Sequence, residues 1–300
     1  MAETLYPRLT LAEIKVARGE YDQAHDLLAA IASVELGEDP RFLGPLHTTR
    51  AELALGEKHL PEAIDEVKRG LEVVRGTENS VELLRLCAVG LRATADRATQ
   101  KGATEADRTS AKATGDWLAH EASGAAPKPP TAETTQLVLL GKAERQRIQG
   151  TDTAALWRKV AAGWTKLDRP YPAAYARFRE AAAAARAGDK AGARQIVRGV
   201  HQVVTKLRAE PLRVKVAALA KGVGVDVGRA PRIERPYNLT EAELETLRLV
   251  AEGKDAAGIA AARNVSPRTA ETQRQNVYKK LGVRSAFEAV ALTNKEGLLD

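Results

Sequence analysis

Cysteine, methionine and aromatic residues are scarce in this chain of 300 residues. There is one cysteine, Cys87, and one methionine, and Phe, Trp and Tyr together make up 4% of the composition. A single cysteine excludes an intramolecular disulfide framework and a cluster of thiolate metal ligands, and it favours a reducing compartment. We therefore expect a cytoplasmic protein that folds without disulfides.

Long apolar runs and secretion signals are also lacking. No stretch is long and apolar enough to span a bilayer, and residues 1–4 do not form a basic segment followed by an apolar one. The sequence therefore predicts no membrane partner.

Motifs for catalysis and metal binding are absent as well. No Gly-x-Ser-x-Gly elbow occurs, and strand signals that could build the acidic pocket of a receiver domain are lacking. The histidines stand singly, without His-x3-His spacing, at His25, His47, His59, His120 and His201. These absences predict a protein that is not an enzyme and needs no metal or other cofactor.

The bulk composition suits two folded domains and a negatively charged partner. The chain is 44% hydrophobic and has 46 Lys and Arg against 39 Asp and Glu, a formal net charge of +7. The length is typical of about two domains, and the apolar content is ample for buried cores. Excess positive charge fits a nucleic-acid partner without establishing one.

Residues 5–219 have the composition and periodicity of helices. They are rich in Ala, Leu, Glu and Arg, and β-branched runs are short, so we expect an all-α protein. A small-residue pattern recurs in the segments 19–24, 60–63 and 188–193, each followed by apolar residues at helical spacing. This pattern resembles the tetratricopeptide repeat. An irregular helical bundle remains the alternative, since Ala-rich helical hairpins produce similar coincidences.

Two segments rich in Pro or Gly are predicted to be linkers. Residues 121–135 contain Pro127, Pro129 and Pro130, and residues 221–238 contain several Gly and Pro residues. The sequence therefore predicts a helical region over 1–220 with an internal break at 121–135, a linker over 221–238 and a second domain over 239–300.

The second domain contains a helix-turn-helix pattern. Residues 259–262 end a short helix, residues 263–265 form a corner, and a second helix begins at Ser266 and Pro267. Ser266 can cap the free N–H groups of the first turn, and Pro267 has no N–H to leave unpaired. Further helix starts and stops are predicted at Thr240 with Glu243, Gly253, Asp255, Ser285 with Glu288, and Gly297.

Helical spacing divides the helix over 267–281 into two faces. The packing face comprises Ala270, Gln273, Val277 and Leu281, and the outward face comprises Arg268, Glu271, Thr272, Gln275 and Lys279. Glu271 is the one acid between residues 263 and 284, against the basic residues Arg263, Arg268, Arg274, Lys279, Lys280 and Arg284. Basic side chains neutralise phosphates, and amides and hydroxyls reach base edges. A bare charge run is usually a solvated helix face, but the corner and caps favour a DNA-reading helix.

A long family pattern runs through this domain at fixed spacing. It comprises Leu239-Thr240-Glu241, Glu245, Leu247, Leu249, Ala251, Gly253, Ile259-Ala260, Val265-Ser266-Pro267-Arg268-Thr269, Lys280-Leu281-Gly282-Val283, Ala289 and Gly297-Leu298. The domain therefore resembles the DNA-binding domain of the LuxR family of bacterial transcription regulators. The resemblance implies that the helix over 267–281 enters the major groove. It also implies that the last helix supplies a dimer contact on half-sites about one helical turn apart.

The resemblance also assigns roles to side chains. It places Glu271, Thr272 and Gln275 towards bases, and it places towards the DNA backbone Arg268, Thr269, Arg274, Asn276, Lys279 and Lys280. The chain departs from the usual family residues at Gly258, Ala270 and Gln273, where a polar residue, a larger β-branched residue and His are common. These departures bear on the affinity for DNA.

A second resemblance covers part of the helical region. Its residues are Ala155-Leu156-Trp157, Trp164, Leu167, Asp168-Arg169-Pro170-Tyr171, Ala174, Arg177, Glu180-Ala181, Gly188-Asp189, Ala193 and Pro211-Leu212. They resemble the helical region before the DNA-binding domain in the large ATP-binding LuxR regulators. No phosphate-binding loop occurs, since Gly141-Lys142 is followed by Ala143, so the nucleotide switch of those proteins is not expected.

Four aromatic residues of this region admit two interpretations. Trp157, Trp164, Tyr171 and Tyr175 could form a ligand-binding box, but their spacing near multiples of a helical turn favours core packing.

Together these features predict a bacterial DNA-binding transcription regulator. Its expected partners are double-stranded DNA, a second copy of the chain, and a protein or small-molecule effector at the helical region. We expect it in the cytoplasm, at the nucleoid when bound. The alternative is an interaction adaptor whose DNA-binding domain is weak or inactive.

Overall fold

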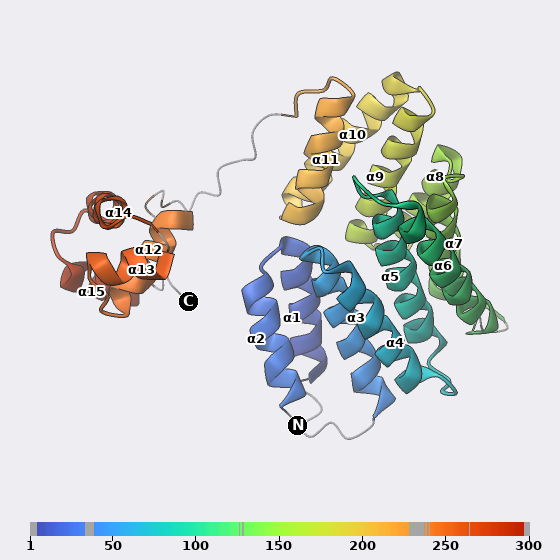
Figure 1. The fold of residues 1–300 in the computed structure, drawn as a ribbon, viewed down its shortest axis with the longest axis horizontal. Helices are drawn as coiled ribbons and strands as arrows, with labels where there is room; N and C mark the ends of the chain where they lie inside the picture. The colour runs from blue at the N-terminus through green and yellow to red at the C-terminus, as the bar shows by residue number, and fades with distance from the viewer. Residues whose placement is uncertain are drawn as a thin grey trace. The chain divides into compact units, whose positions relative to one another are not determined.

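The protein is helical throughout the part of the chain that the structure describes. This computed structural model describes residues 5–33, 39–125, 127, 129–227, 237, 239, 241–263 and 265–296. Within these residues the regular secondary structure is helical, which confirms the predicted all-α class (Figure 1). The chain divides into two compact units, residues 1–228 and 229–300, each with its own apolar core.

The N-terminal unit contains helices α1 to α11. Their bounds are α1 Leu5–Arg18, α2 Tyr21–Ala32, α3 Pro40–Gly56, α4 Leu60–Val74, α5 Ser80–Thr99, α6 Glu105–Ala125, α7 Ala132–Gln149, α8 Ala154–Lys166, α9 Pro170–Arg186, α10 Lys190–Lys206 and α11 Glu210–Gly222. The C-terminal unit contains α12 Glu241–Ala251, α13 Ala256–Arg263, α14 Pro267–Leu281 and α15 Ala286–Glu296.

Several helix pairs of the N-terminal unit are joined by the same kind of tight turn. Each turn has one residue in the left-handed conformation, at Gly19, Lys58, Asp168, Gly188 and Arg208. The N–H of the next residue bonds to the carbonyl five residues before it, as from Glu20 to Lys15 at 2.9 Å. At Gly19 and Gly188 the absence of a Cβ removes the steric cost of this conformation. The recurring turn accompanies a recurring hairpin, whereas the tetratricopeptide assignment remains a prediction.

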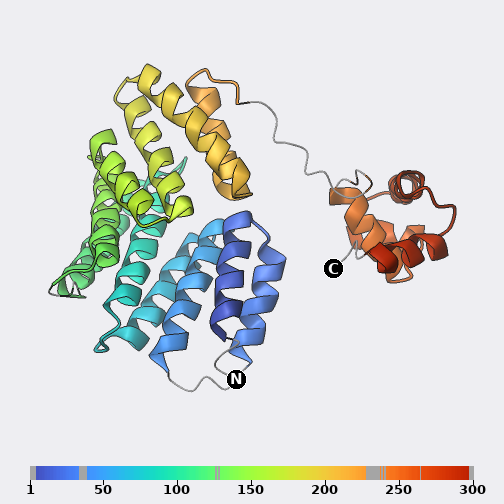
Figure 2. The ribbon, with the colours of Figure 1, turned by 180° about the vertical axis from the view of Figure 1, so that it is seen from behind.

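The first and last helices of this unit meet near their ends. Helix α1 packs against α2 and α3 and also against α11, which lies close to it in both views (Figures 1 and 2). Gly19 permits the approach, since a Cβ there would come within 3.0 Å of Pro211 Cγ. The helices of the unit therefore curve round far enough for its two ends to meet.

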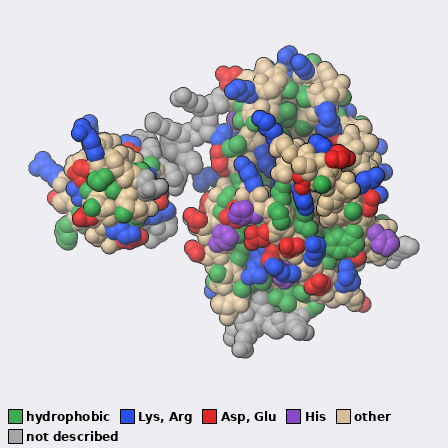
Figure 3. Space-filling model, in the orientation of Figure 1, with side chains coloured by type: hydrophobic (Ala, Val, Ile, Leu, Met, Phe, Trp, Pro, Cys, Tyr) green, Lys and Arg blue, Asp and Glu red, His purple; other side chains and the backbone are tan. Residues whose placement is uncertain are grey.

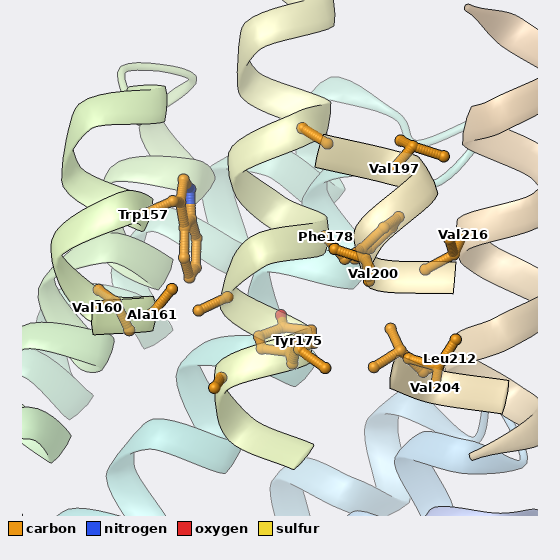
Figure 4. Packing of buried hydrophobic residues seen from close by; sticks show 14 of the residues in the cluster. Trp157, Val160, Ala161, Tyr175, Phe178, Val197, Val200, Val204, Leu212 and Val216 are labelled. Carbon is orange, nitrogen blue, oxygen red and sulfur yellow. The ribbon is translucent and has the colours of Figure 1, made fainter. Parts of the chain in front are cut away.

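An apolar core joins helices α8 to α11. Trp157 of α8, Tyr175 and Phe178 of α9, Val200 of α10 and Val216 of α11 are all buried within it (Figure 4). The same cluster includes the buried Ala residues of α9, whose small size lets the neighbouring helices approach closely.

Helices extend into both segments that the sequence interpretation treats as linkers. Helix α6 continues to Ala125 and α7 begins at Ala132, and α7 packs on α5 and α6, so residues 121–135 do not separate two domains. Helix α11 includes Lys221 and Gly222, and Val223 and Val225 are buried beyond it. Apolar burial keeps this stretch on the helical unit. The predicted linker residues 228–236 and 238 lie outside the described residues.

A charged network ties four helices of the N-terminal unit together. Asp96 of α5 forms ion pairs with Arg147 of α7, with Arg179 of α9 at 2.8 Å, and with Lys215 of α11 at 3.6 Å. Burial alone would raise the pKa of the Asp96 carboxyl, but the cations around it, Arg147 foremost, hold this pKa well below its usual range. Burial, with the nearby Arg92, lowers the pKa of Lys215 to about 8.

Replacing the central carboxylate should destabilise the N-terminal unit. We expect Asp96→Asn to lower the free energy of unfolding at pH 7 by about 3–5 kcal/mol, because it leaves buried cations without their counter-ion. Since the pKa of Asp96 is depressed in the folded protein, its contribution is present above the unfolded pKa of about 4 and is lost as the pH falls below it. Urea unfolding at pH 7 and below pH 4 measures both effects.

The matched control is Asp116→Asn. Asp116 pairs with Arg145 at 2.8 Å, but both side chains are about half exposed, so its loss should cost less than about 1 kcal/mol. Equal losses for the two variants at pH 7 would contradict the special role of Asp96.

Candidate nucleic-acid interface

Helix α14 is positioned by its apolar edge. Ala270, Val277 and Leu281 of α14 are buried against Leu247 of α12 and Ile259 of α13. The helix also contacts α15. Three neighbouring helices therefore cover one side of α14 and set which side it presents to solvent.

The start and end of α14 follow from local sequence. Ser266 Oγ accepts a hydrogen bond from the Thr269 N–H at 3.1 Å, and Pro267 occupies the first turn, which confirms the predicted cap. Gly282 ends the helix with a positive φ of 70° and donates its N–H to the Lys279 carbonyl at 3.3 Å. Local sequence therefore sets both ends of α14, independently of its packing.

The predicted outward face of α14 is mostly exposed. The exposed side chains are Arg268, Thr269, Thr272, Gln275, Asn276 and Lys279. Lysine and arginine side chains project from the surface of this unit (Figure 3). Within the described residues, Arg268 and Lys279 form no ion pair, so their charges are available to a partner.

The three residues predicted to face bases form local hydrogen bonds in the free protein. Gln275 Nε2 donates to Glu271 Oε1 at 2.9 Å, and Thr272 Oγ1 donates to the Arg268 carbonyl at 2.9 Å. Arg274 pairs with the other Glu271 oxygen at 2.8 Å. The hydrogen bonds from Gln275 and then Arg274 lower the pKa of the Glu271 carboxyl. Glu271 is therefore a carboxylate, and hence a pure acceptor, at neutral pH.

Two residues predicted to contact the DNA backbone have partners within the domain, that of Lys280 on another helix and that of Arg274 on α14 itself. Lys280 Nζ lies 2.6 Å from Glu243 Oε2 of α12, and both side chains are partly buried. Arg274 pairs with Glu271 and lies over the ring of Tyr278, 5.9 Å from its centroid. Tyr278 is itself buried, although the sequence interpretation did not place it on the packing face. Its position three residues before Leu281, which places both side chains on the same side of the helix, was the available signal.

The three residues that depart from the family pattern, Gly258, Ala270 and Gln273, each contribute to the structure of the domain. Gln273 Oε1 accepts a hydrogen bond from Arg263, which also donates to Thr246 Oγ1 at 2.8 Å, so Gln273 joins α14 to α13 and α12. Ala270 is fully buried. The Gly258 N–H donates to Asp255 Oδ1 at 2.8 Å, which confirms Asp255 as a helix cap.

The other predicted helix ends are partly described. Ser285 Oγ accepts from the Glu288 N–H at 3.2 Å, but Glu288 Oε2 accepts from the Arg284 N–H instead of completing the box on Ser285. Thr240, Asn264 and Gly297 lie outside the described residues.

Metal sites and membrane spans are not found in the part of the chain that the structure describes. No group of His, Cys, Asp and Glu there is arranged to hold a metal ion. None of the helices described is both long and apolar enough to cross a bilayer.

Comparison with known proteins identifies the C-terminal domain. Residues 237–293 match the family described as bacterial regulatory proteins, luxR family. This confirms the resemblance inferred from the sequence: the domain is a LuxR-type helix-turn-helix, the DNA-binding domain of transcription regulators. No curated protein and no solved structure matches the chain.

The Lys280–Glu243 pair leads to a prediction about stability. Lys280→Met should lower the stability of the C-terminal unit by about 1–2 kcal/mol, because it removes the ion pair between Lys280 and the partly buried Glu243 carboxylate. Lys279→Met, one residue away and exposed, should change it by less than about 0.5 kcal/mol. Hydrogen exchange of the α12 and α14 amides measures both. Equal protection in the two variants would show that Lys280 has no structural role.

Proposed function

We propose that this chain, whose C-terminal domain is of the luxR family, is a bacterial transcription regulator that reads duplex DNA with the outward face of α14. The observation that carries the proposal is the exposure of Arg268, Gln275 and Lys279 on the side of α14 opposite its buried edge. A helix held in this way can enter the major groove without disturbing its own packing.

Each exposed group of α14 has a plausible partner on the duplex. Lys279, Arg268 and the short polar side chains of Thr269 and Asn276 suit phosphate and sugar contacts, which position the helix. Thr272 and Gln275 suit base edges. Because Glu271 is ionised and surrounded by donors, it suits the amino group of cytosine, the base-edge donor that a carboxylate accepts from.

The proposed complex contains two copies of the chain. Phe287 on α15 is 83% exposed, the most exposed large apolar side chain among those described. An exposed phenylalanine at this position supports an isologous contact between two C-terminal domains on a two-fold operator. The N-terminal unit would supply protein interaction or sensing. The bound protein would lie at the nucleoid in the cytoplasm.

The alternative function is an adaptor without useful DNA binding. The ion pairs that hold Arg274 and Lys280 within the domain favour this alternative, because they reduce the charge available to phosphates. Filter binding of the full chain to duplex DNA at two salt concentrations separates the two functions. The regulator loses affinity steeply as salt rises, whereas the adaptor is not retained even at low salt.

Two substitutions on α14 should affect DNA binding in different ways. Gln275→Ala should relax the preference for one base by about 1–3 kcal/mol, because it removes an amide from a base edge. Lys279→Ala should weaken binding to all sequences alike and reduce the salt slope by about 1. Lys68→Ala, which removes an exposed lysine of the N-terminal unit, is the control. If both α14 variants bind like this control, the proposed reading face is wrong.

Phe287 provides a test of the proposed dimer. Phe287→Ser should abolish cooperative binding to a two-half-site operator and leave binding to a single half-site unchanged, because the side chain supports the protein contact and not the DNA contact. Val214→Ser, at another exposed apolar side chain, is the control. Mobility shifts on one-site and two-site duplexes measure this, and unchanged cooperativity would exclude α15 as the contact.

A further inference from the structure

The N-terminal unit contains a cavity of about 450 Å³ among helices α1, α3, α5, α7, α8 and α9. A smaller hollow of about 40 Å³ adjoins it and reaches α2 and α11. The two share four lining residues, Ala17, Glu52, Arg92 and Tyr171. A cavity of the larger size is within the range that holds small-molecule ligands.

Glu52 brings an unpaired carboxyl group to the junction of these hollows. Within the described residues its side chain has neither a hydrogen bond nor an ion pair. Burial raises the pKa of this carboxyl, with Arg85 acting against the rise. Arg85 is already engaged by Glu13 at 2.7 Å and by Glu82 at 3.4 Å. Desolvating a carboxylate without a partner is costly, so a cation or donor in the cavity would relieve Glu52.

Arg92 brings an unpaired cation to the same junction. Its guanidinium lies 4.3 Å from the ring centroid of Tyr175, and its buried Nε has no hydrogen-bond partner. No carboxylate of the described residues lies within ion-pair distance of it. The nearby Asp96 is occupied by the cations of α7, α9 and α11. Arg92 therefore presents donors, on a side chain oriented by an aromatic face, to whatever enters the cavity.

The remaining wall combines apolar side chains with charged ones, namely Glu13, Arg85, Glu133, Glu144, Asp168 and Arg169. Of these, Glu13, Arg85 and Glu144 form ion pairs within the protein, and Asp168 and Arg169 are exposed to solvent. Leu137, Leu140 and Tyr171 also line the wall, together with Trp164. The Trp164 indole is 5% exposed, and its Nε1 has no hydrogen-bond partner. Tyr175, labelled in Figure 4, contributes to both the core and the cavity. Core packing therefore describes Trp157 fully, whereas Trp164, Tyr171 and Tyr175 also face this space.

We propose that this cavity binds a small zwitterion of the size of a free α-amino acid or a dipeptide. The ligand's ammonium group lies on Glu52, its carboxylate lies on Arg92, and its side chain packs towards Trp164 and the leucines of α7. A simple anion would leave Glu52 unsatisfied, and a simple cation would leave Arg92 unsatisfied. A ligand with both charges a few bonds apart satisfies the two groups together.

This ligand would act as an effector only if the proposed function holds. The cavity is lined by α1 at one end of the helical unit and by α9 near the other, so an occupant would contact segments far apart in the sequence. Ligand binding and DNA binding are therefore measured separately on one preparation. Loss of DNA binding with intact ligand binding contradicts the regulator and not the site.

The test is calorimetric titration of the full chain with a panel of free amino acids and dipeptides. We expect saturable binding of one or more of them. N-acetylation of that compound, or its replacement by the amine that lacks the carboxylate, should weaken binding at least about tenfold. The absence of binding across the panel at millimolar concentration overturns the proposal.

The variant Glu52→Gln separates a binding role from a structural one. It should weaken binding of the free compound at least about tenfold and bring it close to that of the N-acetylated form. Its melting temperature should equal or exceed that of the unchanged chain, since the carboxyl has no partner to lose. Glu72→Gln, at an exposed glutamate of α4, should change neither quantity. Unchanged binding, or a lower melting temperature, for Glu52→Gln would overturn the proposal.

Discussion

The burial of one edge of α14 is the constraint on which the account of this protein depends. Helices α12, α13 and α15 contact α14, and the side chains buried on this edge of α14 are Ala270, Val277 and Leu281. Helical geometry then turns Arg268, Gln275 and Lys279 to the other side. The exposed face of α14 is thus a consequence of apolar packing on its other side.

Charge within the C-terminal domain is divided between two tasks. Lys280 and Arg274 neutralise carboxylates of the domain itself, whereas Arg268 and Lys279 have no such partner in the described residues. The number of basic residues on and around α14 is therefore larger than the number of unpaired positive charges that a duplex would meet. A similar division exists in the N-terminal unit, where Asp96 is surrounded by cations while Glu52 and Arg92 stay unpaired beside a cavity. In both units the unpaired groups mark where a partner would be recognised.

Local features were predictable from the sequence, and tertiary pairings were not. Three predicted features depend only on residues close together in the chain, and all three are present in the structure. They are the helix caps at Ser266 and Asp255 and the buried edge of α14. The Gln273–Arg263 and Lys280–Glu243 contacts join residues of different helices, so spacing alone carries no sign of them. Helix α11 extends into the segment predicted to be a linker, and the Pro and Gly content of that segment does not report the burial of Val223 and Val225. The cavity had no sequence signature, since its lining comes from helices spread from α1 to α9.

The central claim, that the outward face of α14 reads duplex DNA, is tested most directly by selection of bound sequences from a random duplex pool with the full chain. We expect enrichment of a two-fold symmetric site whose half-sites are about one helical turn apart. A pool that emerges without an enriched sequence, at a salt concentration low enough to retain non-specific complexes, would contradict it.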